Sequence, residues 1–254
     1  MHTNQRSSFK NYRGGIQLTK VSAHYDLMAE NYDSHYDKNQ GRIYYGHICS
    51  SVSKKLPKGA KLLDLGCGTG LFMQRYLKSG GVAFGIDISR GMIKKAKCRN
   101  NSEVFEGTAE VLPFKSETFD CISSILAFSY LQDPAGTLEE IFRVLKPGGA
   151  VSICTLGKNV FTAIVPAAYR IGEKLHVNRV GMGSFGEHYY KEHELYDIFF
   201  SAGFTDISVE RCSFAHVDLK PQIYQITKKF EPFVEEKIPY FAFNICASGI
   251  KPKK

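Results

Sequence analysis

The sequence lacks the patterns that mark several classes of protein. Its seven cysteines are odd in number and include no Cys-x-x-Cys pair, which argues against a zinc module or a disulfide framework. No apolar run is long enough to span a bilayer, and residues 1–8 lack the apolar core of a secretory signal. We therefore expect a cytoplasmic protein whose cysteines are reduced and mostly buried.

Acidic residues are missing from residues 1–20, and the net charge of +8 is concentrated at the two chain ends. The basic residues there are Arg6, Lys10, Arg13, Lys20, Lys251, Lys253 and Lys254. The chain between them is almost neutral, so the charge is weak evidence for nucleic-acid binding. We predict a flexible basic tail over residues 1–20 and one domain over residues 21–254, a length that suits a single large core.

Strand-like and helix-like segments alternate through the chain. Residues 21–56 read as helical, strands are predicted at 61–65, 82–87, 103–106, 119–125, 150–155, 207–212 and 241–249, and helices at 71–79, 91–99, 135–145 and 192–202. Ser89 is expected to cap the start of the helix at 91–99. Lys146–Gly149 is expected to end the helix at 135–145. This order predicts an α/β fold with a doubly wound, mostly parallel seven-stranded sheet and helices on both faces. The alternation of strands and helices is interrupted by two predicted cover segments, at residues 158–186 and 219–239.

Three alternating glycines follow the first predicted strand. Gly66, Gly68 and Gly70 have no Cβ, so their backbone can approach a ligand closely and adopt positive φ. A dinucleotide fingerprint would need another glycine where Leu71 stands, and a P-loop would need a lysine directly after Gly70. The loop is therefore a poor phosphate cradle and a candidate for another adenosine cofactor.

An acid at the end of the second strand completes this pattern. Asp87 lies 21 residues after Gly66, where a carboxylate can accept both hydroxyls of a ribose. Ile88 follows it and could pack against an adenine face. Gly107–Glu110, after the third strand, lies at the same edge of the predicted sheet and could reach adenine nitrogens.

These motifs resemble those of class I S-adenosylmethionine-dependent methyltransferases, within them the ubiquinone, menaquinone and sterol methyltransferase-like group. The resemblance covers about residues 22–155 in order and continues in residues 187–210; its motifs are Asp64–Gly70, Asp87, Gly107–Phe114, Phe119–Asp120 and Arg143–Gly149. It implies a Rossmann-like fold, S-adenosylmethionine as methyl donor and S-adenosylhomocysteine as product. No metal is expected, because the transfer does not require one in principle.

The resemblance also implies which residues bind the cofactor. The expected set is Tyr25, Tyr32, Asp64, Gly66, Cys67, Gly68, Gly70, Asp87, Ile88, Thr108, Ala109, Glu110 and Ala127. Asp64 and the glycine loop would face the methionine part of the cofactor, and Asp87 its ribose. Thr108 stands where the family commonly has an aspartate near the adenine amino group, and its hydroxyl can still accept one hydrogen bond.

Tyr25 and Tyr32 belong to a segment similar to the family's N-terminal Tyr-Asp-x-x-Ala-x-x-Tyr-Asp cofactor cover. They are seven residues apart and share one helical face; the alternative is that two aromatics simply pack a surface helix. A sulfonium methyl is already activated, so its transfer needs alignment, a dry site and a correctly protonated nucleophile. The candidate catalytic residues are Tyr130, His188 and Tyr190, each with packing as the alternative role.

Absent motifs narrow the acceptor. No Asn/Asp-Pro-Pro-Tyr follows the fourth strand, no Pro-Cys nucleophile is present, and the scattered cysteines argue against arsenite. The apolar residues of 158–186 and 219–239 favour a small, apolar, lipid- or quinone-like acceptor drawn from a membrane surface, although both segments could merely cover the sheet. Methylation of protein or RNA, a catalytically silent cofactor-binding regulator and an NAD(P) oxidoreductase remain as alternatives, the last disfavoured by the glycine spacing.

Overall fold

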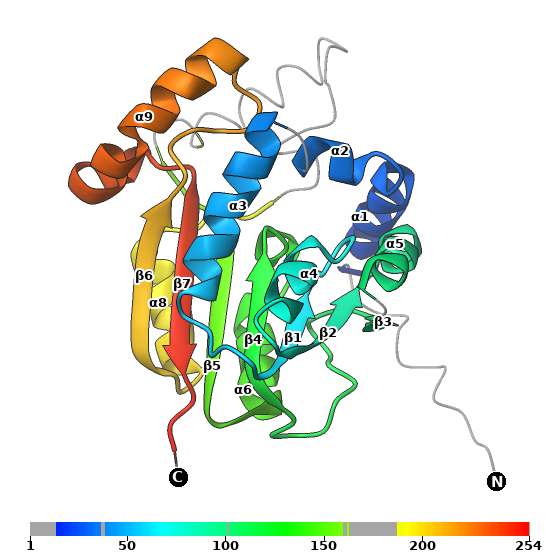
Figure 1. Cartoon of the computed structure of the whole chain (residues 1–254). Coiled ribbons are helices and arrows are strands. Elements are labelled where there is room, and N and C mark those ends of the chain that lie inside the picture. The colour runs from blue at the N-terminus through cyan, green and yellow to red at the C-terminus, as the bar shows by residue number, and fades with distance from the viewer. Residues whose placement is uncertain (1–13, 37–38, 101, 160–161, 163–186, 254) are drawn as a thin grey trace, which may run out of the picture.

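A computed structural model describes residues 14–36, 39–100, 102–159, 162 and 187–253. One seven-stranded sheet has the order β3-β2-β1-β4-β5-β7-β6 (Figure 1). Its strands are β1 Lys61–Leu65, β2 Val82–Asp87, β3 Glu103–Glu106, β4 Phe119–Ile125, β5 Leu145–Leu156, β6 Thr205–Cys212 and β7 Asn244–Ile250. Strand β7 runs antiparallel to both neighbours, and the other pairs are parallel. The predicted doubly wound, mostly parallel sheet is confirmed.

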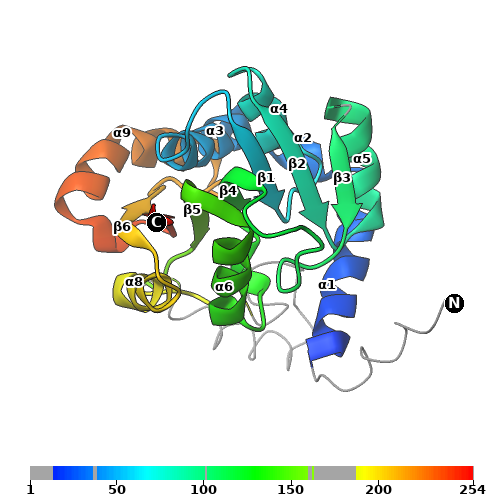
Figure 2. The same cartoon turned by 90° about the horizontal axis from the view of Figure 1, so that it is seen from below.

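Helices cover both faces of this sheet, as Figure 2 shows. They are α1 Gly14–Met28, α2 Tyr32–Tyr36, α3 Asn39–Ser53, α4 Leu71–Leu77, α5 Arg90–Asn100, α6 Pro134–Val144, α8 Glu192–Ser201 and α9 Pro221–Lys237. Helices α3, α4 and α5 bury one face in a core with Phe72 and Met73, and α6 and α8 bury the other with Phe199 and Leu138. The sheet therefore lies between two layers of helices, each with its own buried apolar core.

Most predicted boundaries are close to the observed ones. The Ser89 hydroxyl accepts the Met92 N–H at 3.2 Å and caps α5, as expected. Helix α1 begins at Gly14, so residues 14–20 are helical although they were assigned to the flexible tail. Residues 1–13, with three of the basic side chains, lie outside the described residues, as does the predicted cover segment 158–186 apart from residues 158, 159 and 162.

Lys146–Gly149, the glycine-rich segment after α6, is not a separate turn that ends the helix but part of strand β5. Strand β5 begins directly at Leu145, and its register with β4 jumps from Phe119–Leu145 to Cys121–Ala150. The residues between them form a bulge in which Gly148 adopts a φ of 77°, a left-handed conformation that costs glycine little. The predicted start of this strand at residue 150 was therefore five residues late.

The cysteines are scattered along the sequence, as expected, but three of them lie close together in the folded protein. Cys154, Cys212 and Cys246 come from the three adjacent strands β5, β6 and β7, and their sulfur atoms all lie within 4.8 Å of one another. The argument against a clustered cysteine set therefore fails, because sheet order rather than sequence spacing decides which strands are neighbours. None of the described helices is long and apolar enough to cross a membrane.

Candidate functional site

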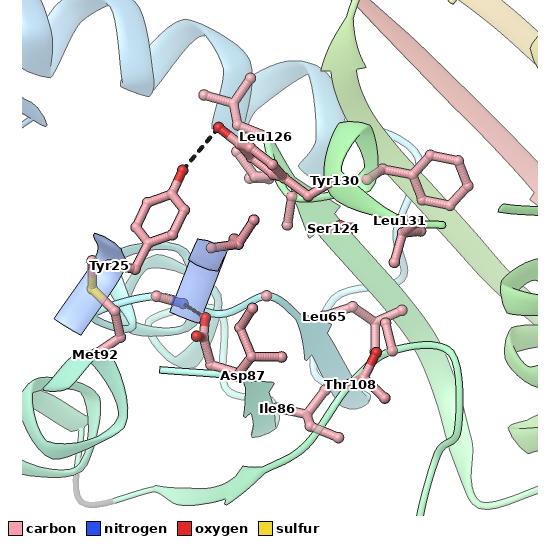
Figure 3. A pocket seen from close by; sticks show the side chains of 18 of the residues that line it. Tyr25, Leu65, Ile86, Asp87, Met92, Thr108, Ser124, Leu126, Tyr130 and Leu131 are labelled. Carbon is pink, nitrogen blue, oxygen red and sulfur yellow. Dashed lines mark hydrogen bonds between the residues drawn. The ribbon is translucent and has the colours of Figure 1, made fainter. Parts of the chain in front are cut away.

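A pocket lies at the carboxyl ends of β1, β2 and β4, and Val21 and Tyr25 of α1 also line it (Figure 3). It brings together ten of the residues predicted from the sequence: Tyr25, Tyr32, Gly66, Gly68, Asp87, Ile88, Thr108, Ala109, Ala127 and Tyr130. The pocket is partly open to solvent, and its volume is about 90 Å³. This is smaller than the roughly 300–1,000 Å³ of typical small-molecule sites.

The glycine loop after β1 forms the floor of the pocket. Gly66, Gly68 and Gly70 have φ values of 64°, 53° and 78°, all in the left-handed region. A Cβ atom on Gly66 would lie 2.3 Å from the Cβ of Ala127, so this position also lacks room for a side chain. The Gly66 N–H donates to the Ile86 carbonyl at 2.8 Å, which ties the loop to β2. The positive φ and the lack of room for a Cβ atom together explain why position 66 is a glycine.

Asp87 is the one charged side chain that lines the pocket among the described residues. Its carboxylate accepts the Gly68 N–H at 2.8 Å and the Ser89 N–H at 2.9 Å, so it holds the glycine loop against the start of α5. Burial raises the pKa of this carboxyl group, and the backbone N–H donors oppose that shift. A carboxylate fixed in this way is preorganised to accept hydrogen bonds from a ligand.

Three tyrosines form the cover of the pocket. The Tyr25 hydroxyl donates to the Tyr130 hydroxyl at 3.0 Å, and the two ring centroids are 5.9 Å apart (Figure 3). The Tyr25 and Tyr32 rings pack edge to face at 6.2 Å. Burial raises the pKa of Tyr25 and of Tyr130, so both phenols stay protonated at neutral pH. In this state the Tyr130 hydroxyl can donate a hydrogen bond to a ligand.

Two aspartates that the sequence analysis did not single out anchor this cover. Asp26 accepts the Ser89 hydroxyl at 2.6 Å and the Gly91 N–H at 2.9 Å, which fixes α1 to the start of α5. Asp33 accepts the Thr69 hydroxyl at 2.5 Å and pairs with Arg99. The signal was present, because each aspartate directly follows one of the two tyrosines seven residues apart. In each Tyr-Asp pair, the tyrosine lines the pocket and the aspartate holds the helix.

Four predicted cofactor residues lie outside the pocket lining. Asp64 is buried between β1 and β4, where its carboxylate accepts the Ser123 hydroxyl at 2.6 Å, and burial raises its pKa to about 7. Cys67 is buried with its sulfur toward Gly85, and Gly70 precedes α4. Glu110 accepts the backbone N–H of Gln132 at 2.6 Å and so connects the loop after β3 to the loop before α6. In this structure these four residues support the loops around the pocket, and their contact with a cofactor stays a prediction.

Of the three candidate catalytic residues, only Tyr130 lines the pocket. The His188 side chain is 57% exposed, and its backbone N–H donates to the Ser129 carbonyl at 2.8 Å. Tyr190 is buried against Phe128 with ring centroids 5.7 Å apart. The two residues dock their segment onto the end of β4.

The sequence analysis missed most of the apolar lining. The additional residues, all apolar except Ser124, are Val21, Leu65, Ile86, Met92, Ser124, Ile125, Leu126, Phe128 and Leu131. Several of them directly precede or follow motif residues, and that adjacency was the available signal. Leu126 adopts a φ of 59°, which turns the chain sharply after β4 and brings Ala127 over Gly66.

Comparison with known proteins identifies this architecture. Residues 63–153 match the family model described as a methyltransferase domain. The chain therefore carries a domain of the class I S-adenosylmethionine-dependent methyltransferase type. The matched methyltransferase segment runs from within β1 to within β5 and carries the glycine loop, Asp87 and Tyr130. The resemblance stated from the sequence is confirmed.

Two relatives and one solved structure illustrate the match. A demethylmenaquinone methyltransferase of Streptomyces griseus is 34% identical over 150 residues, 58% of this chain and 64% of that protein. A malonyl-[acyl-carrier protein] O-methyltransferase of Erwinia billingiae is 30% identical over 142 residues, 56% of this chain and 55% of that protein. The matches thus span less than two thirds of these relatives. A Thermotoga maritima methyltransferase titled a possible histamine N-methyltransferase shares the fold with a TM-score of 0.66, at 21% identity over 91% of this chain and 99% of that one.

Proposed function

We propose that this chain transfers a methyl group from S-adenosylmethionine to a small, apolar acceptor. The observation that carries the proposal is the charge of the pocket. Among the described residues its lining offers one carboxylate and no lysine or arginine. The Asp87 carboxylate would attract a positively charged sulfonium, and Leu71 stands where a dinucleotide fingerprint needs its third glycine. This favours the methyl donor over NAD(P).

Each part of the cofactor then has an expected partner. Asp87 would accept the ribose hydroxyls, since a carboxylate offers about four lone-pair sites and two are taken by backbone N–H groups. Ile88, Thr108 and Ala109 would hold the adenine, and the glycine loop the methionine part. The faces of Tyr25 and Tyr32 would attract the sulfonium by a cation–π interaction and exclude water.

The bound cofactor supplies an activated methyl group, and the protein aligns and protects it. Tyr130 would orient the acceptor by donating a hydrogen bond, because its raised pKa keeps the phenol protonated. A general base is then needed only if the acceptor atom itself carries a proton at neutral pH. His188 and Tyr190 are retained as alternatives that would have to reach the pocket through a rearrangement of the segment at residues 187–190.

The apolar acceptor is supported by a surface at the edge of the sheet where the parallel strands end. Helix α9 lies at that edge (Figure 1) and exposes Ile223, Ile226, Phe230 and Phe233, each 47–58% accessible to solvent. These half-exposed side chains form an apolar surface on α9 beside its buried residues Tyr224 and Val234. A cytoplasmic enzyme that contacts a membrane surface with α9 could take a lipid- or quinone-like acceptor there. The demethylmenaquinone relative agrees with this class.

Calorimetric titration and a methyl-transfer assay test the proposal. We expect binding of S-adenosylmethionine and S-adenosylhomocysteine, no binding of NAD(P), and transfer of labelled methyl to an apolar membrane extract. Asp87→Asn should lower cofactor affinity about tenfold or more, a loss of about 1.4 kcal/mol or more. Asp197→Asn removes an exposed carboxylate on α8 and serves as the matched control.

Three outcomes would contradict the proposal. Binding of the cofactor without turnover on any acceptor class would favour a silent regulator. Transfer to protein or RNA that is abolished by salt and by deletion of residues 1–13 would favour a macromolecular acceptor. Preferential binding of NAD(P) would contradict the cofactor assignment itself.

A further inference from the structure

Three cysteines meet on the face of the sheet that α3 covers. Cys154 on β5 is directly opposite Cys246 on β7, and Cys212 on β6 lies two residue pairs further along, opposite Asn244. The Sγ atoms of Cys212 and Cys246 are 3.3 Å apart, and those of Cys154 and Cys212 are 3.9 Å apart. Cys154 and Cys212 are buried, whereas Cys246 is partly exposed and leaves an approach from solvent.

These separations match those of sulfur atoms around one metal ion. Metal–sulfur bonds to zinc are about 2.3 Å long, so three sulfurs at the corners of a triangle around one ion are about 4 Å apart. The observed sulfur separations, 3.3 and 3.9 Å and none above 4.8 Å, scatter around that value. A small rotation of the side chains would therefore place all three sulfurs on one ion without moving the strands.

The same face carries polar atoms that the protein leaves unsatisfied. In the part of the chain that the structure describes, Ser152 Oγ and Asn244 Oδ1 are buried and have no hydrogen-bond partner. Ser152 lies two residues before Cys154 on β5, and Asn244 two residues before Cys246 on β7, so both share the face of the cysteines. Unsatisfied buried oxygens are uncommon, and two of the nine among the described residues share this face with the three sulfurs.

A neighbouring group of metal-ligating side chains has a structural explanation. His47 on α3 approaches Glu235 on α9 at 2.7 Å, but the Glu235 carboxylate also accepts the Ser213 N–H at 2.6 Å, and the Glu231 carboxylate accepts the Ala215 N–H at 3.0 Å. These contacts join α9 to α3 and to the end of β6. The sulfurs of the cysteine cluster have no comparable task.

We propose that Cys154, Cys212 and Cys246 bind one soft metal ion through three thiolates. Thiolate sulfur selects ions such as Cu⁺ and Zn²⁺ over Mg²⁺ or Ca²⁺. Each thiol gives up its proton on binding, and the ion keeps its oxidation state. Three sulfurs complete a trigonal site for Cu⁺, and Zn²⁺ would add a water on the partly exposed side of Cys246 as its fourth ligand. The site is separate from the cofactor pocket and does not depend on methyl transfer.

Metal titration of the full, reduced chain tests this site. The exposed Cys98 is first replaced by serine, so that no accessible thiol outside the cluster competes. The protein is then titrated with Cu⁺, and separately with Zn²⁺, against a chromophoric chelator. We expect one equivalent of one of the two ions per chain, an ultraviolet thiolate-to-metal absorption band and a raised thermal midpoint.

Substitutions within and outside the cluster complete the test. Cys154→Ser, Cys212→Ser and Cys246→Ser should each abolish the absorption band and the bound equivalent. Cys121→Ser, a buried cysteine on β4, is the matched control and should retain both. Circular dichroism verifies that each variant is folded, and an unfolded serine variant is replaced by the alanine one. A chain that binds neither ion, or cluster variants that bind as the control does, would overturn the proposal.

Discussion

Substitution of Gly66 by alanine separates two reasons for a glycine. The left-handed φ of 64° at Gly66 costs an alanine roughly 1–2 kcal/mol of folding free energy. The added Cβ would also lie 2.3 Å from the Cβ of Ala127, and overpacking of this kind costs about 1–3 kcal/mol. We therefore expect Gly66→Ala to lower the free energy of unfolding by about 2–5 kcal/mol.

Gly59→Ala isolates the first of these terms. Gly59 has a φ of 70°, and a Cβ built there would meet no atom within 4 Å. Its substitution should cost only the roughly 1–2 kcal/mol of the left-handed conformation and leave cofactor affinity unchanged. Gly66→Ala should in addition weaken S-adenosylmethionine binding, because the new side chain displaces the glycine loop. Each 1.4 kcal/mol of lost binding free energy lowers the affinity about tenfold. Urea unfolding and calorimetric titration measure the two effects.

The double variant Gly66→Ala with Ala127→Gly completes the cycle. Removal of the Ala127 side chain takes away the atom that the new Cβ would strike, so stability should be partly restored, with a coupling energy of about 1–3 kcal/mol. The reasoning would be refuted if Gly66→Ala were no more damaging than Gly59→Ala. It would equally fail if the two substitutions at positions 66 and 127 were simply additive.

Three further predictions concern the cover and a buried acid. Asp26→Asn weakens the contacts with Ser89 and the start of α5, so cofactor affinity measured by titration should fall while secondary structure is kept. Tyr130→Phe removes the acceptor of the Tyr25 hydroxyl but no base, so turnover should fall less than about 100-fold with an unchanged pH profile; a larger loss would restore Tyr130 as a base. Burial raises the pKa of Asp64 to about 7 from 3.8, so the folded state binds its proton more tightly than the unfolded state does. Stability should therefore fall as the pH rises from about 4 to 7, by up to about 4 kcal/mol, and urea unfolding of Asp64→Asn should lack that slope.

Much of the fold was predictable because it depends on local patterns. The runs that became β1 to β4 begin and end where the alternation of apolar segments and turns indicated, and Ser89 caps its helix as expected. The bulge at Gly148 was not predictable, because a Pro-Gly-Gly sequence after a helix fits a turn as well as an irregular strand. Only the pairing of β5 with β4 and β7 distinguishes these possibilities.

The sequence by itself determined the glycine loop, Asp87 and the two tyrosines seven residues apart, because each is a short-range pattern whose spacing has a chemical meaning. The tertiary structure decided which of these residues share one pocket. It placed Asp64 and Glu110 behind the loops and His188 at the surface, and it brought Met92 and Phe128 into the lining. It also brought together Cys154, Cys212 and Cys246, which are up to 92 residues apart in the sequence. Sheet order and register, which depend on packing of the whole core, set these long-range neighbours.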